Sequence, residues 1–207
     1  MKELVLVGGG GHCRSVIEAA ESAGRKIHCI LDTPEYTGSY VLGHLVAGTD
    51  DEIESLAGDY EFIVTVGFIK SASLRRRLHK RIERAGGKLA TVIASTAYVS
   101  RYASIGSGTV VLHHATVNAG ATVGPEVILN TGCIVEHDVI IGRGSHISTG
   151  AIVNGGCEIG EEVFLGSNSV VNQGVKITSG VIVASGSVVR HDIDKPGIFI
   201  DGKLKEL

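Results

Sequence analysis

From Ile93 onward, the hydrophobic pattern of the chain repeats every six residues. Seventeen successive positions spaced six apart, ending at Val189, are all branched aliphatic. The residue four places further on in each hexad is small or β-branched, and glycine is frequent between the two. An unbroken six-residue repeat is the signature of a parallel β-helix, in which three hexads form one triangular coil. The pattern therefore predicts a hexapeptide-repeat β-helix over residues 93–195.

Residues 1–92 follow a different pattern, in which short apolar runs alternate with amphipathic stretches. Strands are predicted at 4–7, 27–31, 62–66 and 89–93, with a further short strand within 41–48. Helices are predicted at about 12–23, 50–56 (capped by Thr49 or Asp50) and 71–85. Alternating strands and helices with a glycine-rich first turn predict a Rossmann-like α/β domain. Residues 196–207 form a C-terminal tail, in which 198–200 can add one strand.

Composition limits the kinds of molecule that the protein is expected to bind. The net charge is −3, which favours neither nucleic acid nor an anionic membrane. The sequence shows no apolar stretch long enough to span a membrane and no signal-peptide pattern, so we expect a cytoplasmic protein. The four cysteines lack the close spacing of a metal site, and two of them, Cys133 and Cys157, fall on the inward small-residue track. They are interpreted as buried core thiols, and no metal is expected.

Stacking of the coils turns sequence spacing into geometry, because residues 18 apart lie above one another. His137 lies between Glu136 and Asp138, with Gly155 one coil above it. A histidine beside a carboxylate is the usual arrangement of a general base, and the glycine leaves room for a thin ligand. His146 falls half a coil away, on another face or corner.

Each of these features also has a plain structural interpretation. His137 can be a solvated surface residue, and the column Asn118, Glu136, Asn154 and Asn172 can be a structural ladder. The run Arg75–Arg77 is interpreted as a solvated helix face. The turn Gly8–Gly11 is by itself a weak dinucleotide signal, because Cys13 stands where that motif needs glycine.

Taken together, these motifs resemble a known family. They are Gly8–Gly11 with His12 after the first strand, Asp32 after the second, Val66-Gly67 after a later one, and hexads containing Asn130–Asp138 and Ser145-His146. The chain resembles the nucleotide-sugar acetyltransferases typified by the bacillosamine-pathway N-acetyltransferase, together with their sialic-acid O-acetyltransferase relatives.

The resemblance implies a homotrimer of left-handed β-helices, with acetyl-coenzyme A in the groove between neighbouring prisms. It places the general base on His137, with Asp138 as its acidic neighbour. It implies contacts to the cosubstrate at His146, Gly155, Gly166 and Ser167. It implies substrate contacts at Gly9, Gly10, Gly11, His12, Asp32, Thr33, Gly67 and Asn130.

We therefore expect an acetyl-CoA-dependent N-acetyltransferase that acts on the amino group of a UDP- or dTDP-linked 4-amino sugar by direct transfer. The alternative within the same family is O-acetylation of a sialic acid or a related surface-polysaccharide sugar. A second class of function is non-catalytic, a trimeric scaffold that uses the β-helix only for assembly. A β-helix carbonic anhydrase, with zinc held by histidines such as His113 and His114, is a third.

Overall fold

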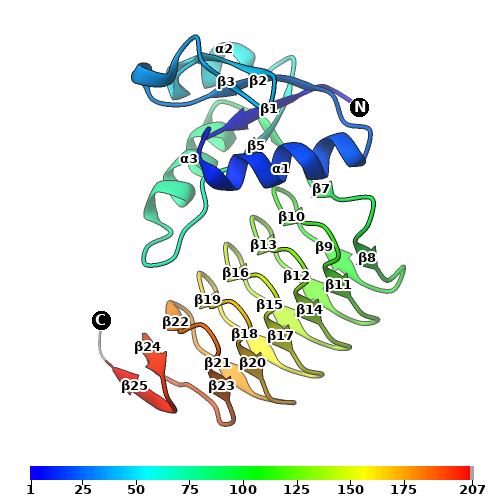
Figure 1. The fold of residues 1–207 in the computed structure, drawn as a ribbon, viewed down its shortest axis with the longest axis vertical. Helices are drawn as coiled ribbons and strands as arrows, with labels where there is room; N and C mark the ends of the chain where they lie inside the picture. Colours follow the sequence, from blue (N-terminus) through cyan, green and yellow to red (C-terminus); the bar gives the residue numbers. More distant parts are fainter. Residues whose placement is uncertain (206–207) are drawn as a thin grey trace. The chain divides into compact units, whose positions relative to one another are not determined.

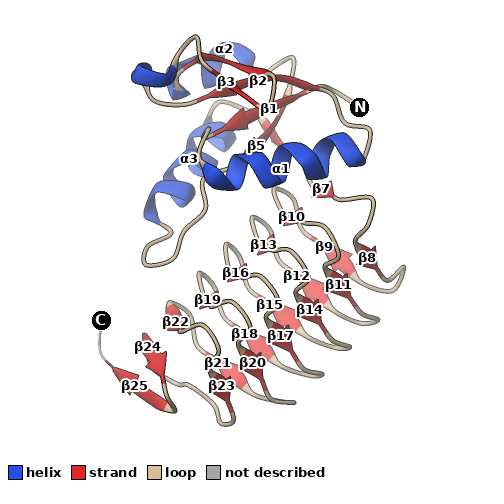
Figure 2. Ribbon diagram, in the orientation of Figure 1, coloured by secondary structure: helices blue, strands red, loops and turns tan. Residues whose placement is uncertain are grey.

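The structure, a computed structural model, describes residues 1–205 and divides into two compact units, Met1–Ser95 and Thr96–Leu207. The first unit is an α/β fold and the second is a parallel β-helix (Figures 1 and 2). No helix among residues 1–205 has the length and apolar character needed to cross a membrane.

The first unit is built on one six-stranded sheet in the order β3-β4-β2-β1-β5-β6. Its strands are β1 (Leu4–Val7), β2 (Ile27–Leu31), β3 (Tyr40–Val41), β4 (His44–Gly48), β5 (Glu61–Val64) and β6 (Lys88–Leu89), and β7 (Val92–Ile93) ends the unit. Its helices are α1 (Gly11–Ser22), α2 (Ile53–Leu56) and α3 (Ser73–Arg84), with 3₁₀ turns η1 (Pro34–Tyr36) and η2 (Asp50–Glu52). All pairs are parallel except the β3–β4 hairpin. From β1 the chain continues to β2 on one side of the sheet, and it later returns to the other side of β1 as β5. The strand order therefore reverses between β1 and β5. In α/β proteins, ligands bind at the carboxyl ends of the strands at such a topological switch point.

The elements predicted for this unit are present, with shifted ends. Strand β5 stops at Val64 rather than Val66, and the predicted strand 89–93 is split into β6 and β7. The predicted helix at 50–56 is a 3₁₀ turn followed by α2, capped by Thr49 in a capping box with Glu52.

The interpretation of Arg75 as part of a solvated helix face is wrong. Arg75 is 2% exposed, and its Nη1 donates to the carbonyl oxygens of Val64 (2.6 Å) and Val66 (2.9 Å). A guanidinium can replace the ladder bonds of a strand end because it carries several donors in one plane. Arg75 therefore fixes the loop that follows β5, at the switch point.

The second unit winds through three parallel sheets, each named here by its first strand within the unit; β7 also belongs to the β10 sheet. The β8 sheet contains β8 (Tyr98–Val99), β11 (Thr116–Val117), β14 (Ile134–Val135), β17 (Ile152–Val153), β20 (Val170–Val171) and β23 (Val188–Val189). The β9 sheet contains β9 (Ser104–Ile105), β12 (Thr122–Val123), β15 (Ile140–Ile141), β18 (Glu158–Ile159) and β21 (Lys176–Ile177). The β10 sheet contains β10 (Val110–Val111), β13 (Ile128–Leu129), β16 (His146–Ile147), β19 (Phe164–Leu165), β22 (Val181–Val183), β24 (Gly197–Ile200) and β25 (Lys203–Lys205).

Every coil pairs in register with the coil 18 residues on, as in Thr116 with Ile134 and Ile134 with Ile152. The aliphatic residues of the hexads point inward and form one continuous core that includes Cys133 and Cys157. Both thiols are buried, as predicted. Residues 197–205 add a strand and an antiparallel return to the β10 sheet.

The corners of the β-helix share one backbone feature. A positive φ recurs at every sixth residue from Gly108 to Gly186. Most of these residues are glycine, which adopts this conformation without steric cost. The exceptions are His114, Glu126, Asp138, Glu162 and Asn168. Asp138, the predicted acidic neighbour of the base, is therefore held in a left-handed turn.

Candidate active site

The glycine-rich turn joins β1 to α1 at the switch point of the first unit. Gly8 has a φ of +110°, and a Cβ placed there would lie 2.6 Å from Cγ2 of Val66. Gly10 is the N-cap residue of α1, whose first turn carries no acidic side chain. The free backbone N–H groups of a helix N-terminus favour an anion, so Gly10 and Gly11 are arranged to receive a phosphate, whereas the N–H of Gly9 is used within the turn.

Asp32 ties this turn to the end of β2. The N–H of Gly9 donates to Oδ2 of Asp32 at 2.7 Å, and the N–H of Thr33 donates to Oδ1 at 2.8 Å. A Cβ on Gly9 would lie 2.6 Å from Oδ2. Gly9 must therefore be glycine for this bond to form, and Asp32 holds two of the predicted substrate-binding residues in place.

His12 and Gly67 are also brought together. A Cβ built on Gly67 would lie 3.6 Å from Cβ of His12, so the loop after β5 passes directly against the first turn of α1. The predicted substrate-binding residues of the first unit thus surround the carboxyl ends of β1, β2 and β5.

Two pockets open at this edge of the sheet, and Asp32 lines both. The first, of about 270 Å³, is lined by Gly9, Gly10, Gly11, Arg14, Asp32, Tyr36, Ser39, Val41 and Val46. The second, of about 230 Å³, is lined by Val7, Gly8, Leu31, Asp32, Thr33, Asp50, Val66, Leu74, Arg77 and Leu78. We call them the glycine-turn pocket and the α3 pocket. The residue pattern had not indicated Arg14, Tyr36, Asp50 or Arg77 as a group, because they come from four separate segments.

In the second unit, His137 and Asp138 form a dyad at the corner between β14 and β15. Nδ1 of His137 lies 2.9 Å from Oδ2 of Asp138, and the two side chains are 59% and 72% exposed. The carboxylate can only accept, so it fixes the ring proton on Nδ1 and leaves Nε2 with a lone pair. The dyad therefore has the arrangement of a solvent-accessible general base.

Glycines on the adjacent coils make room for this dyad. A Cβ on Gly155 would lie 2.5 Å from Nε2 of His137, and one on Gly120 would lie 2.3 Å from Oδ1 of Asp138. The N–H of Gly156 donates to the carbonyl oxygen of His137 at 3.0 Å. The coil spacing of 18 predicts Gly155 above His137, and the same spacing could have identified Gly120 below Asp138.

His146 and Asn130 form a second polar pair, on the β10 sheet. The His146 ring is 7% exposed and packs edge-on against Phe164, with centroids 5.1 Å apart. Oδ1 of Asn130 accepts from the N–H of Thr131 at 2.8 Å, which turns its amide nitrogen towards Nε2 of His146 at 3.2 Å. Nε2 then accepts, and the proton of the neutral ring lies on Nδ1. Because His146 is on a strand of one sheet and His137 at a corner between the other two, one chain does not bring them together.

The remaining predicted cosubstrate-binding residues lie on the same side as His146. Oγ of Ser167 lies 3.1 Å from Oγ of Ser148. A Cβ on Gly166 would lie 2.4 Å from the backbone nitrogen of Ser185 on the next coil. The glycine at 166 is therefore required by the approach of the two coils, whatever else it contacts.

The cysteines are poorly suited to act as nucleophiles. Burial raises the pKa of the Cys133 thiol to about 12, and that of the Cys13 and Cys29 thiols to about 11. Since the thiolate is the reactive form, these thiols are inert at neutral pH. Residues 1–205 contain no group of three or more His, Cys, Asp or Glu side chains placed to hold a metal ion.

Comparison with known proteins gives two family matches. Residues 3–82 match the PglD N-terminal domain, and residues 156–191 match the bacterial transferase hexapeptide (six repeats). No match is found among curated protein sequences.

Solved structures match the whole chain. A histidine variant of perosamine N-acetyltransferase from Caulobacter crescentus, in complex with CoA and GDP-perosamine, is 31% identical, with 99% of this chain and 97% of that chain covered and a TM-score of 0.90. The acetyltransferase domain of PglB from Neisseria gonorrhoeae FA1090 is 32% identical, with both chains fully covered (100%) and a TM-score of 0.90. That domain is also solved in complex with acetyl coenzyme A. WeeI from Acinetobacter baumannii AYE, at 15% identity, 91% and 94% coverage and a TM-score of 0.57, shares the fold.

These matches confirm the fold predicted from the sequence, a Rossmann-like α/β domain followed by a left-handed parallel β-helix. They also confirm that the protein is an acetyltransferase, which removes the scaffold and carbonic anhydrase alternatives. The chain belongs to the hexapeptide-repeat family of nucleotide-sugar acetyltransferases.

Proposed function

We propose that this protein transfers the acetyl group of acetyl-CoA to the amino group of a nucleotide-linked 4-amino sugar, with His137 as general base. The observation that carries the proposal is the 2.9 Å contact between Nδ1 of His137 and Asp138, which leaves Nε2 facing the space above Gly155. The relative from Caulobacter crescentus, solved with CoA and GDP-perosamine, supports both substrate classes.

In the proposed reaction, the amine nitrogen bonds to the acetyl carbon while Nε2 of His137 takes up the amine proton. The carbon–sulfur bond then breaks, and the imidazolium returns a proton to the departing CoA thiolate. Asp138 stabilises the charged ring throughout. The N–H of Gly155 and the ring of His146 would stabilise the negative charge that develops on the acetyl oxygen. The buried, high-pKa thiols support direct transfer without an acyl-enzyme.

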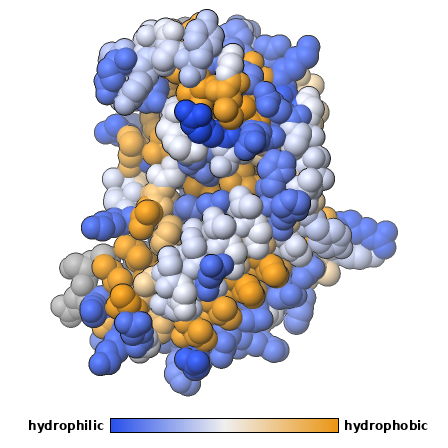
Figure 3. Space-filling view, viewed as in Figure 1, coloured by the Kyte–Doolittle hydropathy of each residue, from blue (hydrophilic) through white to orange (hydrophobic). Residues whose placement is uncertain are grey.

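His137 and His146 can serve one reaction only if two chains meet. Four of the six outward residues of the β8 sheet are aliphatic and half-buried (Ile134, Ile152, Val170 and Val188), and Figure 3 shows orange apolar patches on the visible surface of the β-helix. Such a face suits contact with a second copy. We therefore propose a homotrimer with C3 symmetry, with CoA in the groove between β-helices, where Gly166 and Ser167 would contact it. Sedimentation analysis at micromolar concentration should give three chain masses, and a single chain mass would remove the shared site.

The first unit would hold the nucleotide. Its phosphates would lie on the amides of Gly10 and Gly11, beside Gly9, His12 and Gly67, and Asp32 with Thr33 would face the ribose. Asn130 would lie near the sugar. The sequence-based expectation of uridine or thymidine as the base stays a prediction, as does a cytoplasmic location.

A thiol-release assay tests this function directly. The full chain is supplied with acetyl-CoA and a panel of UDP-, dTDP- and GDP-linked 4-amino sugars, with free sialic acid as the hydroxyl acceptor. We expect CoA release with an amino sugar and the product mass of an amide. Release with sialic acid alone would favour the alternative, O-acetylation.

A further inference from the structure

The two pockets that flank Asp32 differ in chemistry. The glycine-turn pocket presents the amides of Gly10 and Gly11 and the guanidinium of Arg14, which suit an anion. The α3 pocket is walled mainly by aliphatic side chains, Val7, Leu31, Val66, Leu74 and Leu78. Leu74 is 43% exposed, so part of its apolar surface is open to a ligand in this pocket. A flat, weakly polar ring fits the second pocket, and a phosphate fits the first.

Asp32 lies between the two pockets and lines both. In a nucleoside diphosphate, the ribose joins the phosphates to the base, and its hydroxyls are donors that a carboxylate accepts. A ligand with phosphates on the glycine turn and ribose at Asp32 would therefore place its base in the α3 pocket. This order of groups rests on the proposed function, which makes the acceptor a nucleotide sugar.

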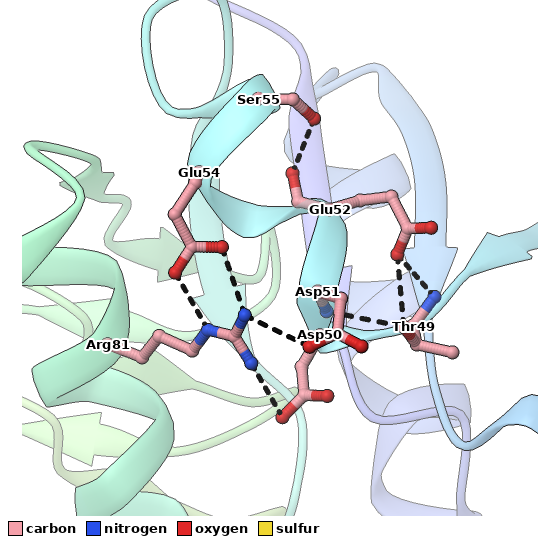
Figure 4. A network of polar contacts seen from close by, with 7 residues as sticks. All are labelled: Thr49, Asp50, Asp51, Glu52, Glu54, Ser55 and Arg81. Carbon is pink, nitrogen blue, oxygen red and sulfur yellow. Dashed lines mark hydrogen bonds and ion pairs between the residues drawn. The ribbon is translucent and has the colours of Figure 1, made fainter.

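Besides Asp32 and Thr33, the α3 pocket has two charged residues in its wall, Asp50 from η2 and Arg77 from α3. Asp50 is held by a network that Figure 4 shows from close by. Nε of Arg81 lies 2.9 Å from Oε1 of Glu54, its Nη2 lies 3.1 Å from Oδ1 of Asp51, and its Nη1 lies 3.6 Å from Oδ2 of Asp50. The capping box of Thr49 and Glu52 fixes the start of the same turn. The carboxylate of Asp50 is thus positioned before any ligand binds.

We infer that the α3 pocket binds the base of the acceptor nucleotide and that Asp50 and Arg77 select guanine, instead of the uridine or thymidine expected from the sequence. A carboxylate only accepts hydrogen bonds, and guanine presents two adjacent donors, N1–H and the 2-amino group, beside the acceptor O6. Uracil and thymine present one donor between two carbonyl oxygens, so a carboxylate that meets N3–H also meets a repelling oxygen. Adenine and cytosine place a ring acceptor beside their amino group. Arg77 would donate to O6 or N7 of guanine, as arginine does in DNA recognition.

Calorimetric titration of the full chain with nucleoside diphosphates, without acetyl-CoA, tests this inference. GDP should bind at least about tenfold more tightly than UDP, dTDP or ADP, since a bidentate contact discriminates by about one order of magnitude or more. Inosine diphosphate, which lacks only the 2-amino group, should also bind more weakly than GDP. Asp50→Asn should weaken GDP binding by about tenfold and leave UDP binding nearly unchanged, because the amide keeps one acceptor but places a donor against the second donor of guanine.

Asp51→Asn is the matched control. Asp51 carries the same charge, touches the same arginine and is 81% exposed, but it does not line the pocket, so GDP affinity should stay within about twofold of the wild type. Equal losses in the two variants, or UDP or dTDP binding as tightly as GDP, would overturn the inference. In that case the proposed function survives. If no nucleoside diphosphate binds at all, the nucleotide-sugar function fails together with the base assignment.

Discussion

The two units of this protein differ in whether the residues that stabilise the fold are also the residues proposed to act in binding or catalysis. In the β-helix, Val135 points into the core and is fully buried, whereas His137, two residues later, is 59% exposed at a corner. In the α/β unit, Asp32 lines both pockets and also bonds the backbones of Gly9 and Thr33. At the proposed base, the β-helix therefore keeps its core and its chemistry in separate residues, while in the α/β unit Asp32 would serve both. Substitutions in the two units should separate stability from function in one case and lose both together in the other.

The largest effect expected is on catalysis. His137→Ala should lower kcat on the order of 10²–10⁴, the usual contribution of a general base. It should change the free energy of unfolding by less than about 0.5 kcal/mol, because the side chain lies outside the core. Steady-state kinetics and urea unfolding check the two parts. Asp138→Asn should cost less in rate, since the ring that accepts the proton remains and only the charge beside it is lost. A His137→Ala enzyme with most of its activity would mean that the amine loses its proton to solvent.

The converse substitution tests the inward positions. Leu129→Ala, at a fully buried site, should lower the free energy of unfolding of the β-helix by about 2–5 kcal/mol. Ile140→Ala is the outward control, at 51% exposure, and should change it by less than about 0.5 kcal/mol. Chemical denaturation followed by far-UV circular dichroism measures both. Comparable losses in the two variants would contradict the separation of inside from outside.

A third substitution alters the space next to the base. Gly155→Ala would place a Cβ 2.5 Å from Nε2 of His137, so the ring must move. A displacement of about 1 Å can cost on the order of 10² in rate, and we expect a loss of kcat of that size. In Gly156→Ala, the Cβ meets nothing within 4 Å, but φ is +68°. This control variant should lower the free energy of unfolding by about 1 kcal/mol and leave kcat nearly unchanged. Unchanged kcat in Gly155→Ala would show that the position of the ring is not critical.

In the α/β unit, a single substitution should affect both properties. Asp32→Ala removes the acceptor of two backbone N–H groups, so the unit should lose on the order of 1.5–3 kcal/mol of stability. The same change should raise KM for the nucleotide sugar and leave KM for acetyl-CoA nearly unchanged. Asp59→Ala removes an exposed carboxylate of the same unit and serves as the control. A variant with altered KM and full stability would mean that Asp32 acts in binding without stabilising the fold, as His137 is expected to act in catalysis.

The last effect is a pH dependence of stability that the two units share. The folded-state pKa is raised from 9.0 to about 11 for Cys13 and to about 12 for Cys133. Their contribution to stability is therefore complete below pH 9.0 and falls as the pH rises towards the folded-state values, because the unfolded thiols ionise first. Urea midpoints at pH 8 and pH 10.5 should show this decline, and Cys133→Ala should make it shallower. An unchanged slope in that variant would mean that other groups cause the decline.

Sequence periodicity predicts more of the β-helix than of the α/β unit. The spacing of 18 puts Gly155 against His137 because the ladder register never shifts. Nothing comparable links Asp32, Asp50 and Arg77, which tertiary packing brings to one pocket from three segments. Arg75 was misinterpreted for the same reason. Its neighbours in sequence are exposed, and only the packing of α3 against the end of β5 accounts for its burial.

Because its register is uninterrupted, the β-helix also fixes the distances between sites along its axis. One inserted residue would rotate every later inward side chain to the outside, so the unit can change length without loss only by whole coils of 18 residues. Each added coil moves the C-terminal strands away from the dyad by about 4.8 Å, the spacing of adjacent strands. The length of a ligand that spans from the dyad to the C-terminal strands can therefore change only in steps of one coil. In a designed variant, this length is chosen by adding or removing whole coils.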